Sequence, residues 1–200
     1  DMTVRTLHLS QSMAKSVTSA VAGILVGQGL LDPEEQISTY LPELTQTGWK
    51  VAKLRHALDM TSGVRYVEDY EALDSDMAST DVASGWRPAK PDVPYFHCIW
   101  DQILSLTETV REHGKVFEYR SIETEVLAHC MERVTQTPLA ELISHELWQP
   151  LGVEESACFT VDGAGYPLAD GGFNATLRDY ARFGEMLCND GTANGQQIVP

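Results

Sequence analysis

Residues 10–17 form the stretch Ser10-Gln11-Ser12-Met13-Ala14-Lys15-Ser16-Val17, which leads into a long apolar segment, Val17 to Leu31. The stretch contains a serine and a lysine three positions apart. Residues three apart on a helix lie on one face, so the Lys15 amine can reach the Ser12 hydroxyl if Ser12 opens the first turn. The sequence therefore predicts a helix that begins with a Ser–Lys pair.

A serine hydroxyl is a poor nucleophile until a neighbouring base takes its proton. The unpaired N–H groups at a helix start add positive potential, which favours loss of the Lys15 proton and an anion on Ser12 or its adduct. We therefore predict an activated serine at position 12. The alternative is a serine that caps the helix, followed by a solvated lysine.

Length and composition indicate one globular domain, or one domain with part of another. The 200 residues are 43% hydrophobic and 22% charged, with a formal net charge of −15 from 14 basic and 29 acidic residues. An acidic surface argues against nucleic acid or an anionic membrane as a partner. It leaves a small-molecule substrate open, because a site can differ in sign from the whole surface.

We expect a cytoplasmic protein that needs no metal or other cofactor. No apolar run approaches the ~20 residues of a membrane span, and the start, Asp1 to Arg5, has no signal-peptide pattern. The four cysteines lie about thirty residues apart without a CxxC pair, so reduced and mostly buried thiols are expected. The six histidines form no HExxH or HxH pair, which argues against a metal site.

Apolar spacing and turn residues predict a helix-rich chain with a few short strands. Extended segments are expected over residues 3–9, 115–119, 159–163 and 171–176, and helices over residues 17–31, 31–42, 51–60, 96–110, 121–135, 138–148 and 177–187. The polar segment at about 65–95 is too long for an idle connection. We interpret it as an ordered excursion with short helices that covers a site.

A second candidate for chemistry is Tyr119, which Ser121 follows two positions later. Tyr119 lies between an extended run and a helix start, where a side chain can enter a cleft. A tyrosine near a lysine can act as a general acid or base. The alternative is an aromatic side chain that packs at a strand end.

Three motifs resemble the serine β-lactamase and penicillin-binding-protein superfamily, on its class C and esterase side. They are Ser12-Met13-Ala14-Lys15, the run Leu54-Arg55-His56-Ala57-Leu58-Asp59-Met60-Thr61-Ser62-Gly63-Val64, and Tyr119-Arg120-Ser121. The second run is the most specific, and in that family it forms a helix and turn beneath the site. Residues 32–44 also resemble the segment that follows the family's nucleophile.

Within the superfamily, the nearest resemblance is to the 6-aminohexanoate-dimer hydrolase group, the nylon-oligomer hydrolases. Four segments are similar to that group: Glu68-Asp69-Tyr70, Ser84-Gly85-Trp86-Arg87, residues 117–127 and Ala169-Asp170-Gly171-Gly172. Ser121 stands where the commoner family pattern has asparagine, which weakens a β-lactamase interpretation.

The resemblance implies a role for each matching residue. Ser12 would be the acylated nucleophile, Lys15 its proton partner and Tyr119 the acid or base for the leaving amine or alcohol. Substrate contacts would come from Tyr70, Asp81, Trp86, Ser121 and Asp170. For Asp81 and Asp170 the alternative is a solvated loop acid, and for Trp86 it is a packing anchor of the loop.

The implied fold is the α+β fold of β-lactamases and transpeptidases, with residues 1–200 holding mainly its helical region. The family's third motif, Lys/His-x-Gly on a strand, is absent from these residues and is expected after Pro200 with most of the central antiparallel sheet. The first strands are expected before Asp1. We therefore expect an internal fragment that is poorly active alone, because the second oxyanion-hole donor comes from that strand.

The implied activity is hydrolysis of amide or ester bonds in small linear substrates through an acyl-enzyme on Ser12. The same motifs also serve β-lactamases, D-amino-acid peptidases and carboxylesterases. Two interpretations from other classes stay open: a non-catalytic penicillin-binding-like sensor, and a helical interaction domain whose motifs are accidental. A homodimer is left open as well.

Overall fold

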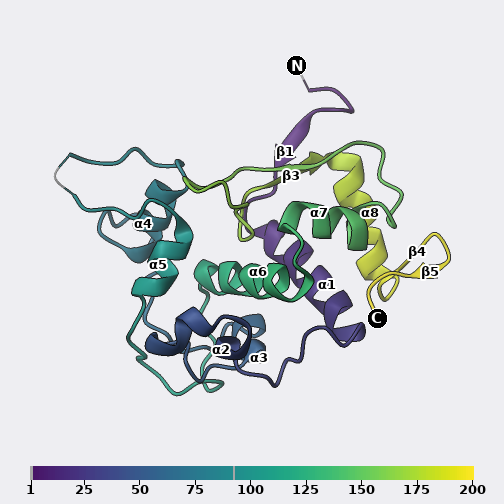
Figure 1. Cartoon of the computed structure of the whole chain (residues 1–200). Helices are drawn as coiled ribbons and strands as arrows, with labels where there is room; N and C mark the ends of the chain where they lie inside the picture. The colour runs from purple at the N-terminus through teal and green to yellow at the C-terminus, as the bar shows by residue number, and fades with distance from the viewer. Residues whose placement is uncertain (1, 92) are drawn as a thin grey trace.

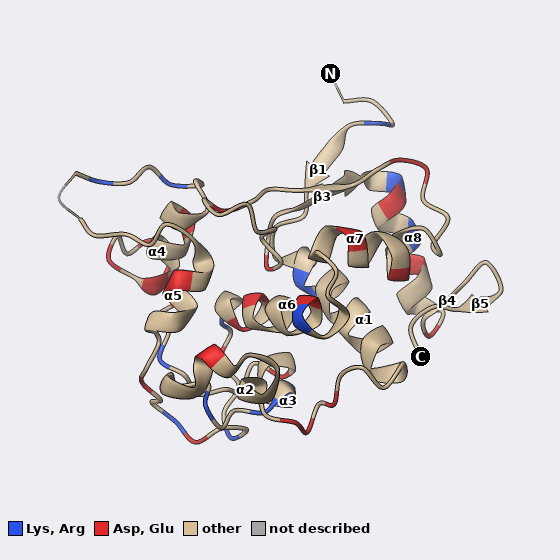
Figure 2. Cartoon of the chain, in the orientation of Figure 1, with Lys and Arg blue, Asp and Glu red and all other residues tan. Residues whose placement is uncertain are grey.

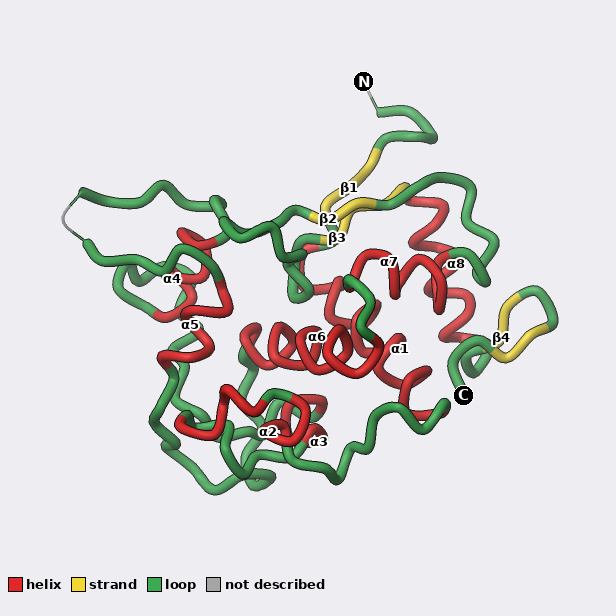
Figure 3. Tube along the Cα trace, in the orientation of Figure 1, coloured by secondary structure: helices red, strands yellow, loops and turns green. Residues whose placement is uncertain are grey.

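Helices are the main regular structure of this chain, and short strands lie at one side of them (Figure 1). The computed structural model describes residues 2–91 and 93–200. The helices are α1 (Ala14–Gly27), α2 (Ile37–Tyr40), α3 (Leu54–Leu58), α4 (Asp76–Ala83), α5 (Ile99–Ser105), α6 (Ser121–Thr135), α7 (Leu139–Ile143) and α8 (Leu177–Cys188). Two 3₁₀ turns, Gln11–Met13 and Pro42–Gln46, and a π-helical turn, Ser144–Trp148, adjoin them. Figure 3 shows that long loops join several of these helices.

The strands form a three-stranded antiparallel sheet and a small hairpin. The sheet has the order β1-β3-β2, from β1 (Leu7–Leu9), β3 (Phe173–Thr176) and β2 (Cys158–Phe159), and the hairpin pairs β4 (Thr192–Ala193) with β5 (Gln196–Gln197). Because β3 is central, it places the end of β1 beside the loop that precedes residue 173. Ser10 continues the pairing, since its N–H donates to the Phe173 carbonyl at 2.8 Å. The α+β composition expected from the sequence, with few strands, is confirmed.

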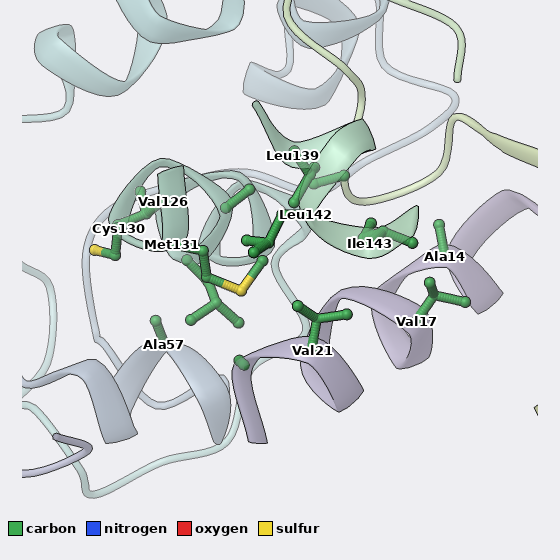
Figure 4. Close-up of a cluster of buried hydrophobic side chains, with 14 of the residues drawn as sticks. Ala14, Val17, Val21, Ala57, Val126, Cys130, Met131, Leu139, Leu142 and Ile143 are labelled. Atoms are coloured by element: carbon green, nitrogen blue, oxygen red, sulfur yellow. The ribbon is translucent and has the colours of Figure 1, made fainter. Parts of the chain in front are cut away.

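The core lies where α1 packs against α6 and α7 (Figure 4). Ala14, Val17 and Val21 recur at helical spacing along one face of α1, and all three are fully buried. Each buried valine contributes roughly 1.5–3 kcal/mol through removal of its side chain from water. Met131 of α6 and Ile143 of α7 point toward this face (Figure 4). This packing fixes the position of the start of α1, and with it the Ser–Lys pair.

The sequence predicted α6 and α8 well and three other helices less well. The expected helix over 51–60 is only Leu54–Leu58, because Lys53 is extended and pairs with Gln36. The expected helix over 96–110 is only Ile99–Ser105. The helix expected to restart at Asp32 is wrong up to residue 36. There the Asp32 side chain accepts the Glu34 N–H and forms a turn instead of a helix cap.

The segment at residues 65–95 contains α4 and then loops away from the helices before α5 (Figure 1). Buried hydrogen bonds fix its first half: the Tyr66 hydroxyl pairs with Thr80 at 2.7 Å, and Thr80 donates to Gln102 of α5 at 2.8 Å. This part of the predicted excursion is therefore ordered and attached to α5. Residue 92 lies outside the described residues.

Acidic residues are distributed over the whole chain instead of gathered in one segment (Figure 2). All four cysteines are free, but Cys158 and Cys188 are exposed, so the expectation of mostly buried thiols holds only for Cys98 and Cys130. Within the described ranges, none of the helices has both the length and the apolar character needed to cross a membrane.

Candidate active site

Ser12 lies on the surface in the 3₁₀ turn that directly precedes α1. The helix begins at Ala14, before the apolar segment expected from residue 17, and Ser12 precedes the helix instead of opening its first turn. Gln11, the residue before Ser12, has a φ of 50°, a left-handed conformation that is uncommon for residues other than glycine. Such backbone strain persists where the surrounding structure enforces it and often marks functional sites. The chain therefore presents the Ser12 hydroxyl to solvent from a constrained turn.

Lys15 is buried, with 8% of its surface exposed, and its amine is aimed at Ser12. The Nζ atom donates to Ser12 Oγ at 3.1 Å and to the Asp170 carbonyl at 2.8 Å. It also lies 3.7 Å from the Asp170 carboxylate. The contact predicted from the three-residue spacing is present, and the alternative of a solvated lysine is wrong.

Asp170 lies in the loop before β3, and the pairing of β1 with β3 brings this loop beside the start of α1. Its carboxylate is 8% exposed and faces Lys15, so the alternative of a solvated loop acid is wrong for this residue. The Asp170 N–H donates to the Glu125 carboxyl of α6 at 2.9 Å. Contact of Asp170 with a substrate stays a prediction.

Tyr119 lies just before α6, with 37% of its surface exposed. Its ring centre is 5.1 Å from Lys15 Nζ, which is the geometry of a cation–π contact. The next residue, Arg120, is 1% exposed and donates to Glu118 at 2.6 Å. The buried Arg120 thus anchors the backbone while the neighbouring Tyr119 ring reaches the Ser–Lys pair. The alternative of a purely packing aromatic does not fit this exposure.

Ser121 and Tyr70 meet through a residue to which the sequence assigned no role, Glu68. The Glu68 carboxylate accepts the Ser121 N–H and hydroxyl at 2.6 Å each, and the Tyr70 hydroxyl at 2.5 Å. Burial, followed by the hydrogen bond to Glu68, raises the pKa of Tyr70 above its usual value. Glu68 lies two positions before Tyr70 in the sequence, and this short separation from a predicted site residue was the available signal for it.

Asp81 and Trp86 lie at the end of α4 and just after it. The Asp81 carboxylate is 15% exposed and lies 3.2 Å from the Arg87 guanidinium, so it is not a solvated acid. Burial is the main cause that raises the pKa of Asp81. Trp86 is 39% exposed, and its ring lies against Gly171. A Cβ atom added to this glycine would lie 3.2 Å from the Trp86 ring. Trp86 therefore packs against the loop that also carries Asp170.

The turn Thr61-Ser62-Gly63 contacts the first turn of α6. The Ser62 hydroxyl donates to Glu123 of α6 at 2.7 Å. Gly63 has a φ of 68°, and a Cβ atom there would lie 2.4 Å from the Arg111 carbonyl, so only glycine fits. In the part of the chain that the structure describes, no three His, Cys, Asp or Glu side chains gather as metal ligands would.

These residues lie in a chain that belongs to the Beta-lactamase family, which it matches over residues 1–200. It is 36% identical over 194 residues to the 6-aminohexanoate-dimer hydrolase of Paenarthrobacter ureafaciens, covering 96% of this chain and 48% of that protein. A solved Bacillus anthracis structure, provisionally named a 6-aminohexanoate-dimer hydrolase, superposes with a TM-score of 0.91 at 33% identity, covering 99% of this chain and 52% of the other.

A family VIII carboxylesterase shares the fold at a TM-score of 0.70 and 19% identity, over 97% of this chain and 58% of that structure. The predicted fold class, of the β-lactamase and transpeptidase type, is thereby confirmed. The chain spans about half the length of the first two relatives.

Proposed function

We propose that this protein is a serine hydrolase that cleaves amide or ester bonds through an acyl-enzyme on Ser12. One contact carries the proposal: a buried lysine amine, Lys15 Nζ, lies 3.1 Å from the hydroxyl of an exposed serine. An amine held in the interior against a solvent-facing hydroxyl is the arrangement that nucleophilic catalysis requires. Membership of the Beta-lactamase family supports the same chemistry.

In the proposed reaction Lys15 first gives its ammonium proton to solvent, and its amine then takes the Ser12 proton while Oγ bonds to the substrate carbonyl carbon. The electron pair of the C=O bond moves to oxygen, and the Ser12 N–H is one donor to that oxyanion. Tyr119, in contact with Lys15, gives a proton to the leaving amine or alcohol as its bond to carbon breaks. Water then attacks the ester carbonyl and gives one proton to Tyr119; the bond from carbon to Ser12 Oγ breaks, Lys15 returns the proton to Oγ, and the acid is released. A second oxyanion donor from the Lys/His-x-Gly motif expected after Pro200 stays a prediction.

We infer that the substrate is a small linear amide with a cationic end, of which the linear 6-aminohexanoate dimer is the first candidate. The relative from Paenarthrobacter ureafaciens carries that substrate in its name. The Glu68 carboxylate accepts the hydroxyl of the predicted contact Tyr70, and its negative charge favours a substrate ammonium group. Ser121 would also lie along this side of the substrate.

Labelling with a fluorophosphonate, followed by peptide mass spectrometry, tests the proposal. We expect one label, on Ser12, and none in Ser12→Ala. Ser16 is a matched control, because it is also exposed on the first turns of α1, and Ser16→Ala should label like wild type. Release of 6-aminohexanoate from the linear dimer then tests turnover. A protein that labels on Ser12 but never turns over an amide or ester would be the sensor, and an unlabelled Ser12 would refute both.

The remaining expectations are separate from this chemistry. A homodimer would be seen by light scattering as twice the monomer mass. Location in the cytoplasm stays a prediction, which cell fractionation would test. Independence of metals predicts unchanged labelling of Ser12 after treatment with a chelator.

A further inference from the structure

Glu125 is a buried acid that the proposed chemistry does not use. It lies one turn into α6 and is 3% exposed. Glutamate is seldom buried unless it is paired. Its Oε1 atom accepts the Asp170 N–H at 2.9 Å, across 45 positions of sequence. The carboxyl group of Glu125 therefore joins α6 to the loop before β3.

Asp170 in turn holds the amine that faces the nucleophile. Its carbonyl accepts from Lys15 Nζ at 2.8 Å, and its carboxylate lies 3.7 Å from the same atom. The amine then donates to Ser12 Oγ at 3.1 Å. A continuous series of contacts thus runs from Glu125 through Asp170 and Lys15 to Ser12. The first three residues of this series are buried.

We propose that Glu125 is a positioning residue: it fixes the backbone at Asp170, and thereby the Lys15 amine, relative to Ser12. This inference rests on the proposed serine-hydrolase function. Glu125 acts through Asp170 and needs no contact with the substrate. Because α6 begins at Ser121, the last residue of the Tyr119 motif, the same contact also joins the two halves of the site.

Glu125 performs this role in its neutral form. Burial, and then the nearby Asp170 carboxylate, raise the pKa of Glu125 well above its usual value, while Lys15 acts in the opposite direction. With Glu125 protonated, one buried cation, Lys15, faces one buried anion, Asp170. A second carboxylate would leave a buried charge without a partner. The Asp170 charge also helps to raise the pKa values of Tyr66 and Asp81, for which burial is the main cause.

Substitutions of Glu125 distinguish a neutral positioning residue from one that only stabilises the fold. Glutamine has the shape of a protonated glutamate: its C=O can accept the Asp170 N–H, and its NH₂ can donate. We expect Glu125→Gln to label Ser12 with a fluorophosphonate within about threefold of the wild-type rate. Glu125→Ala releases the Asp170 loop, and a misplaced catalytic group slows reaction by about 10²-fold. Glu125→Asp draws the carboxyl group back by one methylene and should slow labelling about tenfold. This variant replaces Glu125→Ala in the test if the alanine variant does not fold.

Glu132 provides the matched control on the same helix. Its carboxylate accepts a backbone N–H as well, that of Leu139 at 2.7 Å, and burial raises the pKa of Glu132. Glu132→Ala should lower the urea midpoint of unfolding but leave the Ser12 labelling rate unchanged. If Glu125→Ala behaves in the same way, Glu125 is only structural and the proposal fails. Equal losses in Glu125→Gln and Glu125→Ala would overturn the neutral role.

A second readout does not depend on catalysis. Trace acetic anhydride modifies lysines according to their access, and mass spectrometry compares Lys15 with the exposed Lys115 as an internal reference. We expect Lys15 to acetylate faster in Glu125→Ala and at the wild-type rate in Glu125→Gln. If wild-type Ser12 takes no fluorophosphonate, the proposed hydrolase function fails, and the acetylation of Lys15 still decides the role of Glu125. An unchanged Lys15 rate in Glu125→Ala overturns it.

Discussion

The amine of Lys15 lies 5.1 Å from the ring centre of Tyr119, although Lys15 is on the first turn of α1 and Tyr119 precedes α6. An ammonium group over an aromatic ring gains about 0.5–2 kcal/mol, depending on its exposure to water. The contact brings two side chains that can carry protons to the same place beside Ser12. Their separate contributions to the proposed reaction can therefore be tested by substitution.

Tyr119→Phe keeps the ring and its contact with Lys15 but removes the hydroxyl. Loss of a general acid lowers the rate by about 10²–10⁴-fold where the leaving group needs a proton. We expect kcat/KM for a linear amide to fall by this much. The fall for a p-nitrophenyl ester should be smaller, because p-nitrophenolate leaves without a proton. Steady-state kinetics with both substrates measure the difference.

The control for Tyr119 is Tyr95→Phe, which removes a hydroxyl from a more exposed tyrosine, 58% accessible, in the loop between α4 and α5. It should leave both substrates unaffected. Equal losses on the amide and the ester in Tyr119→Phe would contradict the role of a general acid. They would indicate a defect in acyl-enzyme formation that is independent of the leaving group.

Substitutions of Lys15 should separate stability from activity. Lys15→Met leaves the buried Asp170 carboxylate without its cation, and breaking a buried pair destabilises a protein by about 3–5 kcal/mol. Lys15→Arg keeps a cation there, but a guanidinium group does not give up its proton. We therefore expect both variants to lose Ser12 labelling, while Lys15→Arg unfolds at a higher urea concentration than Lys15→Met. Full labelling of Lys15→Arg would show that Lys15 serves only as a charge.

The parts of the site that depend on local spacing could be predicted from the sequence. The contact of Lys15 with Ser12 follows from a separation of three residues at a helix start. The bounds of α6, Ser121 to Thr135, also followed from local signals, because a polar residue and early acids mark its beginning. In both cases the information lies within one or two helical turns of sequence.

The contacts that complete the site join distant segments, and local patterns do not contain them. Glu68 meets Ser121 across 53 positions, and Glu125 meets Asp170 across 45. One signal was present in α6, where Glu123 and Glu125 fall among apolar positions and are buried with them. Acids on the inner face of a helix require partners, so they indicate a polar site even when the partners are unknown.

Glu123 should make stability depend on pH in a defined window. Burial raises the pKa of Glu123 to about 8, against an ordinary value of 4.5, despite the hydrogen bond from Ser62. The folded protein therefore keeps this proton where the unfolded chain has lost it. The stabilisation from Glu123 is complete below about pH 4.5 and is lost as the pH rises toward 8. Within this window the free energy of unfolding falls by up to about 1.4 kcal/mol for each pH unit.

Urea unfolding at pH 6 and pH 8.5 of wild type and Glu123→Gln measures this effect. The amide cannot ionise and still accepts the Ser62 hydroxyl. The decline in unfolding free energy between the two pH values should be smaller in Glu123→Gln than in wild type. Since Glu125 also keeps its proton on folding, only the difference between the two proteins reports on Glu123. Identical pH dependence in both would show that Glu123 is already ionised in the folded protein at pH 6.

A side chain at Gly171 should disturb the contact between Trp86 and the loop that carries Asp170. A Cβ atom there would lie 3.2 Å from the Trp86 ring and 3.8 Å from the Gln11 backbone, next to Ser12. Gly171→Ala should therefore lower stability by about 1 kcal/mol, the lower end for overpacking, and slow Ser12 labelling. Gly184 of α8 is the control, because a Cβ atom there meets nothing within 4 Å. Gly184→Ala should stabilise its helix by about 1 kcal/mol.

The contact partner of Gly171 can be identified by a double-mutant cycle with Trp86→Ala. If the Trp86 ring is what an alanine at 171 meets, removing the ring abolishes most of the penalty, and the two changes are not additive. A penalty that persists in the Trp86→Ala background would place the conflict at Gln11 instead. In that case the φ of 50° at Gln11 and the position of Ser12 would be the features that require glycine in this loop.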